Sequence, residues 1–308
     1  MAILRFVTNA ISYKNNISAK SFLNTPTTMS EFQLYDFRKI DQPLSNEERK
    51  RVQGLSSHIN VSSRRAVVSY SYGDFKHNEE TVVEQYFDAL LYQTNWGQKK
   101  LVFRFPKDSI DYQQLGEYDI DRGSLTGYTT EIRVWKSGGY VLVNIEYCED
   151  GYEDWVEEND NSLDSMLQLR TEMMNGDFSC LYAFWLKLLQ MQEESDDDDA
   201  DDEYADELPA IPLGLAKPSA ALQSFTDFFD INPFLIKTAG SFIEPAQAQE
   251  IGFISAIESM TDETKNEWLG RLVEGEPLLD IKLKKYLVRA EKSPSQNKPT
   301  YQEIASKL

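Results

Sequence analysis

The residues of this chain best suited to acid–base or metal chemistry are three aspartates, Asp36, Asp74 and Asp88. Paired carboxylates can move protons for a substrate or hold a hard cation such as Mg²⁺ or Mn²⁺. Asp36 falls in an expected strand, Asp74 follows another, and Asp88 falls on an expected helix. The three could converge at one edge of the sheet, although nothing in their spacing fixes that geometry, so a metal-assisted enzyme using Asp74 and Asp88 is kept as an alternative function.

Histidine chemistry has only two candidates, because His58 and His77 are the only histidines in the chain. His58 falls at an expected helix end, and His77 in a loop after a strand, where a solvated side chain is the simpler interpretation. No glycine-rich phosphate loop, HExxH, CxxC or GxSxG pattern occurs. We therefore expect no catalytic constellation, no metal and no cofactor, and we lean towards a protein that is not an enzyme.

Aromatic residues concentrate between positions 70 and 96. RNA-binding sheets use such side chains for stacking, but they carry basic flanks that are sparse here. Core packing explains the cluster better, so we expect no direct nucleic-acid binding. The cluster consists of Tyr70, Tyr72, Phe75, Tyr86, Phe87, Tyr92 and Trp96.

The net charge of −20 comes from two local segments. Residues 149–164 contain eight acids and residues 193–207 contain eleven, and neither holds a Lys or Arg. Removing these nineteen from the 51 acids leaves 32 against 31 basic residues. The acidic runs could imitate nucleic-acid phosphates, which is a second alternative function. They could also steer a partner, or lie against the basic helix that carries Lys282, Lys284, Lys285 and Arg289.

Hydrophobic patterns predict an α+β fold, with an N-terminal mixed sheet that has its helices on one face, followed by an all-helical region. Strands are expected at 32–40, 65–72, 99–105, 128–135 and 140–147, and helices at about 46–54 and 79–92. The strand at 99–105 alternates like a half-buried strand. Lys136-Ser137-Gly138-Gly139 indicates a hairpin turn.

Four regions follow from these patterns. Residues 1–28 are acid-free and are interpreted as unstructured or as a start called too early, with Met29 the favoured start. Residues 29–160 form the α+β domain. Residues 161–292 form the helical region, interrupted by an acidic linker at 193–217, and 293–308 form a loose tail.

Cys148 and Cys180 are expected to be buried, reduced thiols, which favours a reducing, cytoplasmic setting. No apolar run reaches the ~18 residues that cross a bilayer, so no membrane association is expected.

Several short motifs resemble an uncharacterised bacterial protein family associated with gene neighbourhoods that encode SWIM-type zinc-finger proteins. They are Tyr35-Asp36-Phe37-Arg38, Asp41-Gln42-Pro43-Leu44, Tyr72-Gly73-Asp74-Phe75, Tyr86-Phe87-Asp88-Ala89, Asn95-Trp96-Gly97 and the run from Arg271 to Pro277. The resemblance covers most of residues 32–290. It implies a SWIM zinc-finger protein as partner, and no activity.

These observations favour a non-enzymatic interaction protein that docks a protein partner by a sheet edge or the corner around Trp96. The acidic run that contains Trp155 is a further docking candidate. The candidate partner-binding residues are Asp36, Arg38, Asp74, Phe75, His77, Asp88, Tyr92, Trp96 and Trp155.

Overall fold

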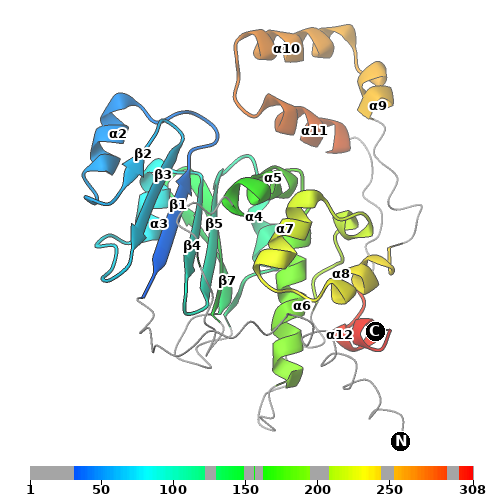
Figure 1. Cartoon of the computed structure of the whole chain (residues 1–308). Coiled ribbons are helices and arrows are strands. Elements are labelled where there is room, and N and C mark those ends of the chain that lie inside the picture. Colours follow the sequence, from blue (N-terminus) through cyan, green and yellow to red (C-terminus); the bar gives the residue numbers. More distant parts are fainter. Residues whose placement is uncertain are drawn as a thin grey trace, which may run out of the picture. The chain divides into compact units, whose positions relative to one another are not determined.

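A computed structural model of the chain describes residues 31–121, 130–148, 156, 162–194, 208–243, 253–289 and 298–307. Its centre is an eight-stranded sheet in the order β2-β3-β1-β4-β5-β8-β7-β6 (Figure 1). All pairings between these strands are antiparallel. Helices alternate with strands along the chain, but the sheet contains no parallel pair among these strands. The strands are β1 (Gln33–Arg38), β2 (Asn60–Val61), β3 (Arg65–Tyr70), β4 (Ala89–Thr94), β5 (Gln98–Pro106), β6 (Ile120–Asp121), β7 (Glu131–Ser137) and β8 (Tyr140–Cys148).

Helices interrupt and follow the strands of the sheet along the chain, which confirms the expected α+β class. Those within the sheet region are α2 (Asn46–Gln53), α3 (Glu79–Tyr86) and α4 (Tyr112–Gly116). Those after it are α5 (Ser162–Met174), α6 (Ser179–Glu194), the 3₁₀ turn η3 (Leu213–Ala216), α7 (Ala220–Phe228), α8 (Pro233–Gly240), α9 (Phe253–Ser259), α10 (Asp262–Val273), α11 (Leu279–Arg289) and α12 (Tyr301–Ala305).

The sheet has an apolar core on each face. On one face, Phe37 and Leu90 pack with Val52 of α2 and Val83 of α3. Both larger helices of the sheet region thus lie on one face, as the sequence predicts. On the other face, side chains such as Phe103 join the helices that follow the sheet, chiefly α5 to α8. The sheet and the C-terminal helices therefore share one core within the unit Glu31–Leu308.

One expected helix is wrong in its second half. Asn78 caps α3 by accepting from the Thr81 backbone, but α3 ends at Tyr86, and the chain is extended at Phe87. Residues 89–94 form β4 instead, so Asp88 lies between a helix and a strand. β4 is buried along its whole length, and a strand buried on both faces loses the alternation that separates it from a helix.

The strand β5 is also buried on both faces, so the expectation of a half-buried strand there is wrong. Its alternating pattern predicts one exposed face, yet Lys100 and Arg104 are only 7% and 2% exposed. Their charged ends meet acids on neighbouring elements instead of water. Alternation along β5 therefore separates two buried faces and not core from solvent.

Caps and turns of the structure correspond to local sequence signals. Ser45 and Glu48 form a capping box at α2, and Asn232 caps α8 with Pro233 at its first position. β7 and β8 form the expected hairpin, with Gly138 at a φ of 56°. Each of these signals is local, so tertiary packing cannot easily override it.

The C-terminal part differs from expectation in two places. The residues from 300 onward, expected as part of a loose tail, include α12, whose Tyr301 and Ile304 are buried. In α11, Leu287 is buried as expected, but Tyr286 is 47% exposed. Within the described residues, no helix is long and apolar enough to cross a membrane.

Candidate functional site

Asp36 and Arg38, two of the candidate residues, lie in the middle and at the end of β1 and are buried. Asp36 pairs with Arg38 on its own strand and with Arg65 on β3, whose Nη2 lies 3.0 Å from the carboxylate. Arg38 Nε also donates to Asp164 of α5 at 2.8 Å. Burial raises the pKa of Asp36 to about 6, although both arginines oppose the change. The group ties β1, β3 and α5 together.

Asp88 belongs to a second buried ionic group. Its carboxylate lies 2.7 Å from Arg104 Nη2 and also accepts from the backbone amides of Ile40 at 2.7 Å and Asp41 at 3.1 Å. Burial alone would raise the pKa of Asp88, but the hydrogen bond and charge of Arg104 outweigh it and lower that pKa. Arg170 of α5 completes the group through two hydrogen bonds to Asp41, at 2.8 and 2.7 Å.

Asp74 and Asp88 do not share a site. Asp74 accepts from Gln33 at the start of β1, at 2.8 Å, whereas Asp88 accepts from Ile40, two residues after β1 ends. Seven residues of extended chain separate these two contacts by about 20 Å. The two carboxylates therefore cannot act on one substrate or hold one ion. Among the described residues, no group of three or more His, Cys, Asp or Glu side chains could hold a metal ion.

Phe75 and Tyr92 belong to the core under α3 and not to the surface. Tyr35 stacks between them, with ring centroids 5.3 Å from Phe75 and 4.5 Å from Tyr92. The hydroxyls of Tyr35 and Tyr92 both donate to the side-chain oxygen of Gln33, at 2.7 and 3.3 Å. Burial raises the pKa of both tyrosines. Phe75, Phe87 and Tyr92 of the aromatic cluster are thus core packing, as the sequence favours, whereas Tyr72 is 75% exposed.

Three candidates remain for direct contact with a partner among the described residues: Asp74, His77 and Trp96. His77 is exposed and touches Phe75 edge-on, with ring centroids 5.5 Å apart. Trp96 is half-buried in the turn between β4 and β5, where Gly97 adopts a φ of 93°. The edge strands β2 and β6 have two residues each, too few to pair firmly with an added strand. Trp155 lies outside the described residues.

The sequence analysis missed a buried charge network beneath α3. Lys100 of β5 lies 2.8 Å from Glu79 of α3 and 3.0 Å from Glu146 of β8. Arg133 of β7 extends it, 2.5 Å from Glu80 and 3.0 Å from Glu131. Charged residues at matching positions of three strands, opposite a helix that begins Glu-Glu, are the signal that could have revealed it. This network holds α3 on the sheet.

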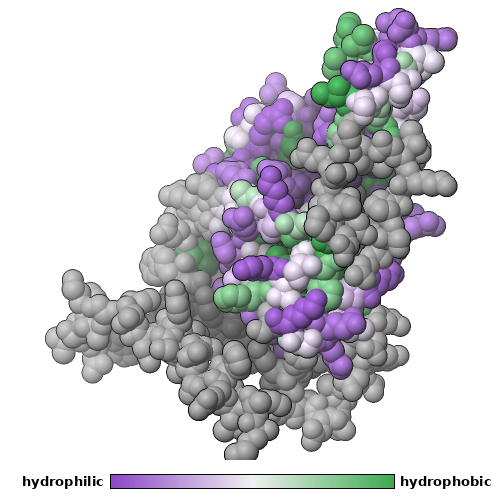
Figure 2. All heavy atoms as spheres, turned by 90° about the vertical axis from the view of Figure 1, so that its right-hand side faces the viewer, coloured by the Kyte–Doolittle hydropathy of each residue, from purple (hydrophilic) through white to green (hydrophobic). Residues whose placement is uncertain are grey.

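Three exposed apolar side chains gather instead on α10. Leu269, Leu272 and Val273 are 57%, 61% and 88% exposed, and their spacing of three and four residues puts them on one helix face. No residue of α10 is buried. We call these three residues the α10 apolar face, and Figure 2 shows hydrophobic residues at the surface in this part of the molecule, at the top of the view.

Exposed acids lie on the other side of α10 from its apolar face. Glu263, Glu267 and Glu274 are exposed, and at about 100° per residue they lie roughly opposite Leu269 round the helix. Arg271 is neutralised by Glu276, 2.6 Å away, and its guanidinium covers the ring of Trp268 at 4.0 Å. Lys265 pairs only loosely with Asp262, at 3.9 Å, and these two residues share the side of the apolar face.

Comparison with known proteins adds no family to this geometry. No protein-family model, curated protein or solved structure matches the chain.

Proposed function

We propose that this chain is a non-enzymatic interaction protein that docks a protein partner on the α10 apolar face. The observation that carries the proposal is the exposure of Leu269, Leu272 and Val273 on one face of a helix that has no fully buried residue. Scattered single apolar side chains are ordinary on protein surfaces, but three on one helix face mark an interaction site.

The charges of α10 bear on the chemistry of the partner. Glu263, Glu267 and Glu274 are exposed on the side away from the apolar face, and Arg271 is already paired within the chain. A partner segment with apolar side chains would bury the apolar face, and a partner that also wraps round α10 would meet these acids with Lys or Arg. The resemblance noted above makes a SWIM-type zinc-finger protein the first partner to try.

The burial of Asp36, Arg38 and Asp88 supports a role without catalysis. Each of these side chains is engaged by groups of the same chain, so none is available to a substrate. The alternative of an enzyme that uses Asp74 and Asp88 has no support, because the two carboxylates lie too far apart to act on one substrate. The acidic runs on which the nucleic-acid-mimic alternative depends lie mostly outside the described residues.

The test compares variants in a photo-crosslinking experiment in cells. A benzoylphenylalanine at position 273 should capture one dominant protein, and the same group at exposed Lys50 of α2 should not. Adding Leu269→Ser and Leu272→Ser should abolish capture, because two of the three apolar contacts are lost. Loss of capture with Glu263→Lys and Glu267→Lys would support the basic partner.

Two outcomes would contradict the proposal. The crosslinker at 273 capturing only a second copy of this chain would make the α10 apolar face a self-association surface. Equal capture by the intact face and by the Leu269→Ser, Leu272→Ser variant would show that the face does not select the partner. Circular dichroism checks that both variants keep their helices, since a largely exposed position tolerates serine.

A further inference from the structure

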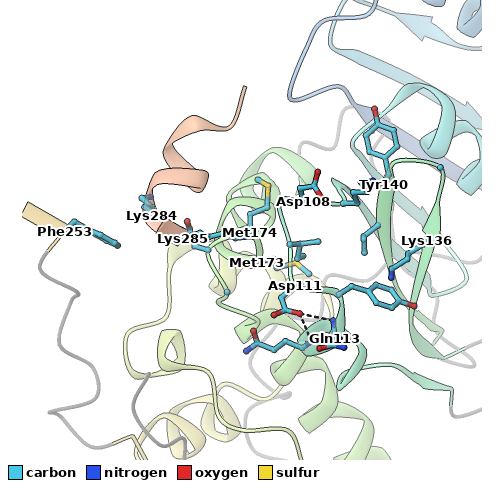
Figure 3. A pocket seen from close by; sticks show the side chains of 18 residues that line it. Asp108, Asp111, Gln113, Lys136, Tyr140, Met173, Met174, Phe253, Lys284 and Lys285 are labelled. Carbon is cyan, nitrogen blue, oxygen red and sulfur yellow. Dashed lines mark hydrogen bonds between the residues drawn. The ribbon is translucent and has the colours of Figure 1, made fainter. Parts of the chain in front are cut away.

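A large cleft lies on the described surface, away from the apolar face of α10. Its volume is about 1060 Å³, and its walls come from the end of β5, α4, the β7–β8 hairpin, the end of α5, and the helices α9 and α11. This volume is at the upper end of what small-molecule sites enclose, about 300–1000 Å³. Figure 3 shows Lys136 and Tyr140 on one side and Lys284 and Lys285 on the other, with Met173 and Met174 between them.

The cleft is basic, although the chain carries a net charge of −20. Four lysines line it, Lys107, Lys136, Lys284 and Lys285, against two acids, Asp108 and Asp111. Asp111 is occupied as the N-cap of α4, where it accepts from the backbone amides of Gln113 at 3.0 Å and Gln114 at 3.2 Å. The lining thus has an excess of positive charge in an acidic protein, which favours an anionic ligand.

The four lysines differ in whether their ammonium groups already contact other groups of the chain. Lys285 donates to the carbonyl of Ser109 at 2.5 Å, and Lys136 lies over the ring of Tyr112 at 3.8 Å. Lys107 and Lys284 have no ion pair or side-chain hydrogen bond with any described residue. Two ammonium groups on different walls are therefore available to an anion that enters between them.

The rest of the lining suits an aromatic or apolar body. Ile110, Val141, Met173 and Met174 supply apolar contact, and Tyr112, Tyr140 and Phe253 supply aromatic rings. Methionine side chains are flexible and polarizable, so Met173 and Met174 can adapt to a ring laid against them. An inorganic ion alone would leave most of this surface uncovered.

We infer that this cleft binds a phosphorylated small molecule with an aromatic body, the chemical class of the nucleotides, with Lys107 and Lys284 contacting its phosphate groups. The inference does not depend on the docking proposed for α10, because the residues of the α10 apolar face do not line the cleft. It assigns a ligand site and no reaction.

The test uses ATP as the probe, without added Mg²⁺, and isothermal titration calorimetry on the full chain. ATP should bind saturably at one site. Lys107→Glu and Lys284→Glu should each weaken binding by about tenfold or more, a change of ~1.4 kcal/mol or more. Lys50→Glu is the matched control, since Lys50 is exposed on α2 and its reversal changes the net charge equally without touching the cleft.

Two further titrations separate the parts of the ligand. Adenosine carries the body without phosphate, and tripolyphosphate carries the anion without the body, so each should bind more weakly than ATP. Tripolyphosphate binding as tightly as ATP would overturn the aromatic part of the assignment. No saturable ATP binding up to about 1 mM, which corresponds to about −4 kcal/mol, would overturn the site. An equal loss of ATP affinity with Lys50→Glu would show that binding depends only on the net charge of the chain, and this would overturn the site as well.

Discussion

Asp36 and Asp88 are similarly buried, 1% and 2% exposed, yet their carboxyl groups respond to burial in opposite directions. Burial raises the pKa of Asp36 to about 6 against two arginines. At Asp88 the hydrogen bond and charge of Arg104 overcome burial and lower the pKa. Asp88 also accepts from two backbone amides, which favour the charged form. Burial therefore does not fix the sign of a pKa shift, and the partners decide it.

The opposite shifts predict opposite effects of pH on stability. Asp36 has a raised folded pKa, so its stabilising contribution is present at low pH and is lost as pH rises from 3.8 towards about 6. Asp36→Asn cannot lose stability in this way, because asparagine does not titrate. The variant should therefore be destabilised most at low pH. The difference in free energy of unfolding between parent and variant should shrink by up to about 3 kcal/mol on going to pH 7, at 1.36 kcal/mol per pKa unit.

Asp88→Asn should behave in the reverse way. Asp88 stabilises the fold above its unfolded pKa, and the contribution is lost as pH falls through the lowered folded pKa. The substitution should therefore cost about 2–4 kcal/mol at pH 7 and less in acid, because it leaves Arg104 without its buried partner. Urea unfolding of both variants across pH 3–7 measures this. Asp164→Asn is the control, since that side chain is 52% exposed and water screens it. Parallel pH curves for the two buried variants would contradict the assignment.

At the level of single residues, the sequence identified which side chains carry charge but not what they are for. Asp36, Arg38 and Asp88 were picked out by chemistry, and the structure uses all three inside the chain. Some of their partners come from far away in sequence; Asp164 lies 126 residues from Arg38. Local spacing cannot report such a distance, so residue type alone suggested a site where a structural network exists.

Two glycines show how the same residue serves different purposes in different helices. Gly240 ends α8 where it packs on η3, and a Cβ there would lie 2.4 Å from the Leu215 carbonyl oxygen. Gly270 lies inside α10, and a Cβ there would meet nothing within 4 Å. Gly240 is thus needed for close approach of two elements, while Gly270 only weakens its helix.

Alanine at these two positions should change stability in opposite directions. Gly240→Ala forces the backbone of η3 away and should destabilise by about 1–3 kcal/mol. Gly270→Ala should stabilise α10 by up to about 1 kcal/mol, because alanine is the better helix former and the site is open. Thermal unfolding of the two variants beside the parent chain gives both signs. A stabilising Gly240→Ala would show that α8 and η3 do not pack as described.

Elements marked by caps, turns or a clear hydrophobic pattern were predictable, but the boundary between α3 and β4, which only hydrophobic residues cover, was not. Ser45, Asn78, Asn232 and Thr261 each cap the helix that follows them. The end of α3 has no comparable signal, because Val82, Val83, Tyr86, Phe87, Leu90 and Leu91 fit a helix throughout. The strand β4 became visible only through its pairing with β1 and β5, which are non-local contacts.

For the molecule as a whole, burial is unevenly shared between its parts. α6 is buried from Ser179 to Leu189, and its Phe184 packs on Phe229, the residue after α7, with ring centroids 5.3 Å apart. β5 and β8 pair along nine residues between two cores. In contrast, α10 buries no residue and exposes three large apolar side chains. Because burial is the main source of stability, local opening should cost far less in α10 than in α6.

Hydrogen exchange should resolve this difference directly. Amides of β5, β8 and α6 should exchange only through global unfolding, and amides of α10 should exchange much faster through local opening. Gly270→Ala should slow exchange in α10 by up to about fivefold, from its gain of up to about 1 kcal/mol in helix propensity, and leave α6 unchanged. Equal protection of α10 and α6 in the isolated chain would mean that the α10 apolar face is already covered, which would remove the basis for docking a partner there. If α10 becomes protected only when the crosslinked partner is present, the low local stability of this helix and its proposed function have the same cause, an apolar face that the chain itself does not bury.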